Sequence, residues 1–135
     1  MAINGEIGVG MPQWILLHQF GKLIYDAFGE FPYLVGSAAV NKEWRDVDVR
    51  LILDDTLFEI LVGKLEQPLI LNRRWSAFCL AWSALGKQMI GLPIDFQIQQ
   101  RTYANTEFAG RPRRALILFG GVEADDNQKR ANEII

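Results

Sequence analysis

Two segments of this sequence alternate between apolar and polar residues with a period of two, the first of them cleanly only at its start, and they constrain the fold most. Residues 46–53 read DVDVRLIL, with one apolar side made by Val47, Val49, Leu51 and Leu53. Residues 93–100 read PIDFQIQQ, with one apolar side made by Ile94, Phe96 and Ile98. Because successive side chains of a strand point to opposite faces, both segments are predicted to be strands with one buried and one polar face.

Helical spacing and capping residues predict three helices, over residues 12–28, 56–65 and 73–90. Thr56 and Glu59 form a T-x-x-E capping box for the second helix, and Asn72 is the expected cap of the third. The third helix is apolar on most of its circumference, so we expect it to be central and nearly buried. Its stripe consists of Trp75, Phe78, Cys79, Trp82, Leu85 and Met89, widened by Ala77, Leu80, Ala81 and Ala84.

This mixture of helices and strands along 135 residues predicts one α/β (α+β) domain over residues 1–135, with a small mixed sheet packed by helices. Short strands are expected within residues 33–37 (YLVGS), where the strand ends in a turn, and at residues 115–119. Residues 1–11 are expected to form a flexible arm or a short edge strand, and residues 120–135 a frayed tail.

Charge and apolar content exclude some locations and partners. The net charge of −2 gives no global reason to expect nucleic-acid binding, and no apolar run is long enough to span a membrane. The single cysteine, Cys79, cannot form an internal disulfide. We therefore expect a cytoplasmic protein without a membrane partner.

Three acidic residues occupy the polar faces of the two alternating strands. Asp46 and Asp48 are two residues apart on one strand, so their carboxylates point the same way. Such carboxylates repel each other unless a cation lies between them, and Mg²⁺ prefers oxygen ligands of this kind. If the strands pair with their polar faces matched, Asp95 joins the first two acids, and the three could hold two metal ions.

A glycine-serine pair, Gly36-Ser37, ends the short apolar segment that precedes the first alternating strand. Glycine allows a sharp turn and a close approach of the backbone to a ligand. A helical turn beginning at Ser37 would point free N–H groups at a phosphate. This pattern predicts a phosphate-binding turn beside a metal site.

The order of VGS, DVDV and PIDFQI resembles the signature of the nucleotidyltransferase superfamily that includes DNA polymerase β. The resemblance covers about residues 13–100 and is nearest to the small single-domain minimal nucleotidyltransferases. It implies that Gly36 and Ser37 bind nucleotide phosphates. It also implies that Asp46, Asp48 and Asp95 bind Mg²⁺ or Mn²⁺ and are catalytic, with Asp95 activating the acceptor hydroxyl.

The resemblance implies a metal-dependent transfer of a nucleoside monophosphate from a nucleoside triphosphate, ATP being the expected one, to a hydroxyl of a protein, an RNA or a small molecule. Minimal members that are paired with a small helical partner modify that partner, which acts as a toxin. A small helical partner protein of this kind, or a homo-oligomer, is therefore a candidate partner of this chain.

Departures from the family pattern support a second hypothesis. Ala38, Ala39 and Val40 stand where minimal members carry an Ala-Arg-Gly-like run, and Arg45 stands where a serine or threonine often precedes the first acid. The alternative is a catalytically weak or inactive nucleotidyltransferase-fold module that binds protein or nucleic acid. Its candidate nucleic-acid contacts are Arg111, Arg113 and Arg114, which otherwise form an ordinary solvated loop.

Several other residues are assigned to packing. His18 is the only histidine, and no nucleophile is spaced to pair with it. Cys79 lies within an apolar helical stripe and is interpreted as a core residue. Trp75 and Trp82 share one helical face, which favours core packing over a base-stacking surface.

Overall fold

A mixed sheet is the centre of the molecule in the computed structural model, which describes residues 5–6, 8–40, 45–64 and 66–120. The sheet has four strands in the order β5-β4-β3-β6. β4 pairs in parallel with β5, whereas β3 is antiparallel to both β4 and β6. The strands are β3 (Tyr33–Val35), β4 (Val47–Leu53), β5 (Ile94–Gln100) and β6 (Arg114–Ala115). The described residues therefore form a mixed α/β fold, as the sequence predicts.

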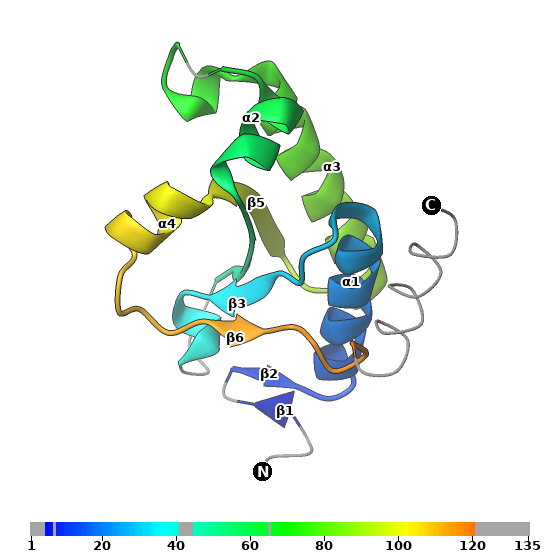
Figure 1. Cartoon of the computed structure of the whole chain (residues 1–135). Coiled ribbons are helices and arrows are strands. Elements are labelled where there is room, and N and C mark those ends of the chain that lie inside the picture. Colours follow the sequence, from blue (N-terminus) through cyan, green and yellow to red (C-terminus); the bar gives the residue numbers. More distant parts are fainter. Residues whose placement is uncertain (1–4, 7, 41–44, 65, 121–135) are drawn as a thin grey trace, which may run out of the picture.

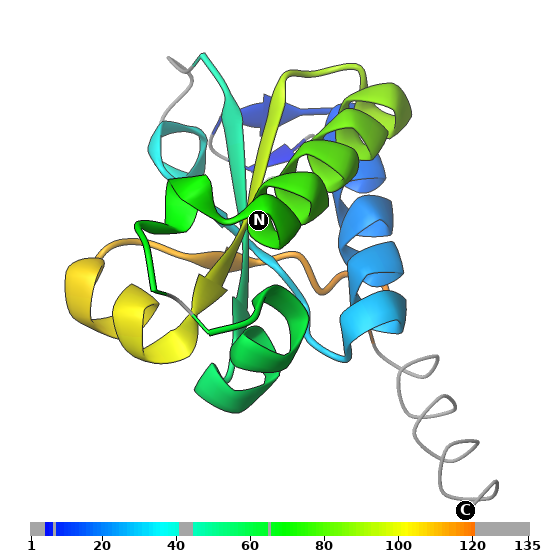
Figure 2. The ribbon, with the colours of Figure 1, turned by 90° about the horizontal axis from the view of Figure 1, so that it is seen from above.

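The apolar side of the sheet is the core, and both alternating strands have the predicted orientation. Every apolar residue of β4 and β5 named above is buried, and the register sets Val49 opposite Phe96. Two helices, α1 (Gln13–Phe28) and α3 (Arg73–Ile90), cover this face (Figures 1 and 2). The polar residues of the same strands consequently line the other face.

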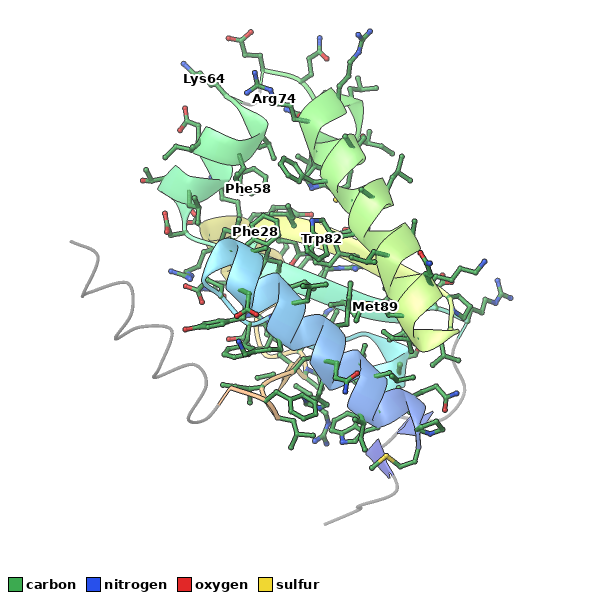
Figure 3. The ribbon with its side chains drawn as sticks, turned by 90° about the vertical axis from the view of Figure 1, so that its right-hand side faces the viewer. Phe28, Phe58, Lys64, Arg74, Trp82 and Met89 are labelled. Carbon is green, nitrogen blue, oxygen red and sulfur yellow. The ribbon has the colours of Figure 1, made fainter. Side chains whose placement is uncertain are left out.

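Aromatic side chains join the two covering helices to the sheet. Trp82 of α3 lies 6.1 Å from Phe20 of α1 and 6.0 Å from Phe96 of β5, measured between ring centroids. Figure 3 shows Trp82 close to Phe28, whose ring centroid is 5.6 Å away. The packing role predicted for Trp82 is confirmed. Trp75 also packs inward, and its indole N–H donates to the carbonyl of Ile98 at 2.8 Å.

The predicted cap of the third helix is confirmed, but its predicted burial is wrong. Asn72 Oδ1 accepts the N–H of Trp75 at 2.9 Å, and Gly91 ends the helix in the left-handed conformation. Leu80 is 71% exposed, and Ala77, Ala81 and Ala84 are exposed too. Only one side of α3 meets the sheet and α1, so the wide apolar circumference did not indicate a fully buried helix.

The second helix, α2 (Asp55–Val62), begins earlier than predicted and is not capped by Thr56. Because β4 ends at Leu53, Asp54 takes the cap position, and its Oδ1 accepts the N–H of Leu57 at 2.9 Å. The helix ends at Gly63. The predicted extension to Leu65 reaches a position outside the described residues.

The C-terminal part of the described chain differs most from expectation. An unpredicted helix, α4 (Arg101–Glu107), follows β5 directly, and Figure 2 shows it on the side of the sheet away from α1 and α3. The strand expected at residues 115–119 is only β6, because Leu116 turns into the core while Ile117 and Leu118 leave the sheet. The polar sequence RTYANTE of α4 has no apolar period that could have predicted it.

The N-terminal arm is a short hairpin rather than an edge strand of the main sheet. β1 (Gly5–Glu6) pairs antiparallel with β2 (Val9–Gly10) in a separate two-stranded sheet. Most of the predicted tail, residues 121–135, lies outside the described residues, as do residues 1–4 and 7. Within the described residues, no helix has the length and apolar character needed to cross a membrane.

Candidate functional site

The glycine of the Gly36-Ser37 turn lies directly against an acidic side chain. Gly36 follows β3 with φ 71° and ψ −157°, a conformation that only glycine adopts readily. A Cβ atom at this position would lie 2.3 Å from Asp48 Oδ2. The turn and the strand carrying Asp48 are therefore in van der Waals contact, as the predicted phosphate and metal halves of one site would require.

Ser37 begins a short 3₁₀ turn, η1 (Ser37–Ala39), instead of an α-helix. Ala38 and Ala39 are buried beneath it, while Ser37 is exposed. A turn of this length has no appreciable helix dipole, so phosphate binding here would depend on the exposed backbone at Gly36 and the Ser37 hydroxyl. Residues 41–44 of the spacer lie outside the described residues.

Two of the three predicted acids are direct neighbours. The parallel register of β4 and β5 sets Asp48 opposite Asp95. Both side chains are on the polar face and partly exposed, Asp48 at 25% and Asp95 at 41%. Asp46 is exposed and lies just before β4, near enough for its charge to raise the pKa of Asp48.

An arginine for which the sequence pattern predicts no role contacts both of the paired acids. Arg50 Nη2 is 3.3 Å from Asp95 Oδ2 and 3.8 Å from Asp48 Oδ1. Its Nη1 donates to the main-chain carbonyl of Asp95 at 2.6 Å, which anchors the guanidinium. The signal available in the sequence was position, because Arg50 is two residues after Asp48 and must share its face.

Asp48 carries an electrostatic cost in this arrangement. Burial raises its pKa above the ordinary 3.8, the charges of Asp95 and Asp46 and a hydrogen bond with Asp95 raise it further, and Arg50 partly opposes them. One guanidinium therefore does not neutralise the carboxylates around it. A divalent cation would relieve the remaining repulsion.

The donor set suits a hard divalent cation, although it is not a preassembled cluster. Among the described residues, no three His, Cys, Asp or Glu side chains form a group that could hold a metal ion. Mg²⁺ commonly uses only one or two carboxylates and completes its shell with water and substrate phosphates. Asp48 with Asp95 or Asp46 could supply those ligands, and a bound triphosphate could supply the rest.

A pocket of about 400 Å³ opens over the polar face of the sheet beside these residues. Its floor comes from β3, β4 and β5, and its wall from the segment after α4. It is lined by Val35, Gly36, Val40, Asp48, Arg50, Ile52, Gln97, Gln99, Phe108, Arg111, Pro112 and Arg113. Its volume is within the range of small-molecule sites.

The three arginines of the basic segment have different surroundings. Arg111 and Arg113 line the pocket, and the guanidinium carbon of Arg111 lies 5.3 Å from the ring centroid of Phe108. Arg113 is held by Asn105 Oδ1 and the Ala104 carbonyl, both at 3.1 Å. Arg114 instead reaches toward the Ala39 carbonyl at 3.4 Å. Two of the three arginines thus line the same pocket as Gly36 and Asp48.

The remaining sequence candidates lie away from this pocket. His18 is buried, and its Nδ1 accepts the N–H of Leu118 at 3.0 Å. Cys79 is buried on α3, and burial raises the pKa of its thiol to about 11. Both contribute to the packed interior, as expected. Arg50, Gln99 and Phe108 also line the pocket, although the sequence pattern predicts no role for them.

Comparisons with known proteins found no matching family model, no matching curated protein and no matching solved structure. The site is therefore interpreted from its own residues.

Proposed function

We propose that this protein is a metal-dependent nucleotidyltransferase that moves a nucleoside monophosphate from a nucleoside triphosphate to an acceptor hydroxyl. The observation that carries the proposal is the contact between Gly36 and Asp48, with Asp95 paired beside Asp48 across the sheet. The pocket lined by Gly36 and Asp48 also contains two arginines, Arg111 and Arg113, from a segment more than 60 residues beyond Asp48. Anion-binding and cation-binding groups adjoin here, which suits a metal-bound triphosphate.

Each residue has a separate part in the proposed reaction. Gly36 and Ser37 contact the phosphates, and Arg111, whose guanidinium lies against Phe108, lines the same pocket. Asp46 and Asp48 are the proposed metal ligands, and Asp95 completes the acidic group. A bound Mg²⁺ or Mn²⁺ would offset the negative charge of the triphosphate.

In the transfer itself, the acceptor oxygen forms a bond to the α-phosphorus, and the bond from that phosphorus to the bridging oxygen of the β-phosphate breaks. Pyrophosphate leaves with the electrons of the broken bond. The proton of the acceptor hydroxyl passes to the Asp95 carboxylate, which is 41% exposed and so accessible to an incoming substrate. The proposed acceptor is a hydroxyl of a protein, an RNA or a small molecule. The proposed partner is a small helical protein or a second copy of this chain.

Arg50 favours a second candidate function, a module that binds nucleotide, protein or nucleic acid without turnover. Its guanidinium contacts both Asp48 and Asp95, the carboxylates that a metal ion would use as ligands. A permanent positive charge in that place could bind anions without any metal. The two functions therefore make opposite predictions about divalent cations.

Transfer is tested by incubating the protein with ATP labelled on its α-phosphate, Mg²⁺ or Mn²⁺ and cell extract, and then detecting a labelled acceptor. We expect labelling that the double change Asp46→Asn with Asp48→Asn abolishes. Glu59→Gln, an exposed acid on α2, is the matched control and should label normally. Labelling that survives the double change would refute the mechanism.

Titration with Mn²⁺ distinguishes the two functions without relying on turnover. The transferase predicts that ATP binding tightens with Mn²⁺ and that Asp48→Asn removes the effect. The metal-free module predicts that the affinity for ATP is the same with and without Mn²⁺ and that Arg50→Gln abolishes ATP binding.

A further inference from the structure

One polar side chain in the pocket is buried but makes no hydrogen bond within the described part of the chain. Gln99 is only 8% exposed, and it lines the pocket. Its neighbour on the same face, Gln97, reaches Asp95 Oδ1 at 3.5 Å, but the amide of Gln99 has no such partner among the described residues. The amide of Gln99 is not among the fully buried unpaired groups of the described residues, so its polar atoms are open to the pocket. An amide that faces a pocket and has no partner among these residues can pair with a bound ligand.

Gln99 lies at the opposite end of the pocket from the proposed phosphate site. The register of β4 and β5 pairs Asp48 with Asp95 at one end and Ile52 with Gln99 at the other. Asp48 and Ile52 are four residues apart on an extended strand, which is roughly 13 Å. A ligand bound at Gly36 and Asp48 that also reaches Gln99 must therefore be long, as a nucleotide is.

The surroundings of Gln99 suit a flat, largely apolar ring with a polar edge. Ile52 is 6% exposed and shares the pocket floor with Gln99, and Phe108 contributes an aromatic ring to the same pocket. Aromatic and aliphatic side chains pack against the faces of planar rings. An amide beside them offers one hydrogen-bond donor and one acceptor to the edge of the ring.

We propose that Gln99 recognises the base of a bound nucleotide and selects adenine over guanine, an inference that rests on the proposed nucleotide-binding function. Adenine carries its amino group next to a ring nitrogen, so a glutamine amide can accept from the first and donate to the second. Guanine presents two acceptors on one edge and three polar groups on the other, and a single amide leaves one of them unpaired. Phe108 and Ile52 would contact the ring, with the phosphates directed toward Gly36.

The first experiment follows the side-chain amide resonances of Gln99 by ¹⁵N NMR during titration with adenosine and, separately, with guanosine. Adenosine should shift these resonances, and guanosine should bind about tenfold more weakly or less. Equal binding of the two nucleosides, or adenosine binding without a shift at Gln99, would overturn the inference.

The second experiment uses Gln99→Met, which keeps the side-chain length and removes the amide. We expect ATP affinity in the presence of Mg²⁺ to fall about tenfold and the preference over GTP to disappear. The melting temperature of the free protein should change little, because the amide of Gln99 makes no hydrogen bond with the described residues that the substitution could remove. If Gln99 has only a structural role, Gln99→Met should lower the melting temperature and keep the preference for ATP over GTP. That result would contradict the proposal. Gln88→Met, on the exposed side of α3, is the matched control.

Tripolyphosphate with Mg²⁺ separates failure of this inference from failure of the proposed function. If tripolyphosphate binds as tightly as ATP, the phosphate site stands and the adenine site is refuted. If adenosine shifts Gln99 but ATP with Mg²⁺ binds no more tightly than adenosine, the adenine site stands and the transferase is refuted.

Discussion

Replacement of Gly36 by alanine tests the contact on which the candidate site depends. The backbone at Gly36 has φ 71° and ψ −157°, and an added Cβ atom would lie 2.3 Å from Asp48 Oδ2 and 3.2 Å from Asp48 Cγ. Gly36→Ala therefore introduces both backbone strain and a steric conflict with the carboxylate. Gly29→Ala is the matched control, because Gly29 has φ 81° but no heavy atom within 4 Å of the added Cβ position.

The two substitutions differ in their expected cost. Gly29→Ala should destabilise by about 1 kcal/mol, the cost of a non-glycine residue in the left-handed region. The conformation of Gly36 costs about 1–3 kcal/mol for other residues, and displacing a packed side chain adds about 1 kcal/mol or more. Gly36→Ala should therefore destabilise by about 2–4 kcal/mol.

Urea unfolding followed by tryptophan fluorescence measures both costs, since Trp14, Trp75 and Trp82 are only half-buried in the folded protein. Repeating Gly36→Ala in an Asp48→Ala background removes the conflicting carboxylate and leaves only strain. The destabilisation should fall by about 1 kcal/mol or more in that background. An equal cost in both backgrounds, or a cost no larger than that of Gly29→Ala, would show that Asp48 does not pack on the glycine turn.

Three further outcomes follow from the described contacts. Because the pKa of Asp48 is raised in the folded protein, the free energy of unfolding should increase as the pH falls from neutral toward 3.8. Asp48→Asn should stabilise the protein at neutral pH and remove this increase, and urea unfolding at several pH values measures both effects. Acidification should have the opposite effect through Asp55, because its hydrogen bonds with Thr102 lower its pKa in the folded protein. The stability that ionised Asp55 contributes above pH 3.8 is lost below that pH, and Asp55→Asn should remove this pH dependence. Leu80→Lys should change the free energy of unfolding by less than about 0.5 kcal/mol, whereas Trp82→Ala should cost about 3–5 kcal/mol; thermal unfolding checks both.

The strands were predictable because their side-chain pattern is local. Alternation alone identified β4 and β5 and the correct buried face of each, since one apolar side chain in two is enough to define a face. The cap at Asn72 was predictable for the same reason. Thr56 was a wrong choice of cap because two aspartates precede it, and which of them begins the helix depends on where β4 ends.

The rest depended on positions that only the folded chain brings together. No local pattern indicates that Asp48 pairs with Asp95, because the two residues are 47 positions apart in sequence and the register of their strands is set only in the folded chain. The same register sets Arg50 beside Asp95 and Gln99 beside Ile52. The polar helix α4 was missed because its sequence has no apolar face, although it leads into the pocket wall.

The two faces of β4 and β5 divide each strand into two sets of positions with separate roles. Val49, Leu51, Phe96 and Ile98 face the core, while the pocket residues face the other way. Substitutions at the pocket positions have little effect on core packing, so ligand preference can change without loss of the folded state. A laboratory evolution experiment restricted to Arg50, Ile52, Gln97 and Gln99 should therefore yield many folded variants with different ligands, because the scaffold that holds these positions lies on the far side of the same strands.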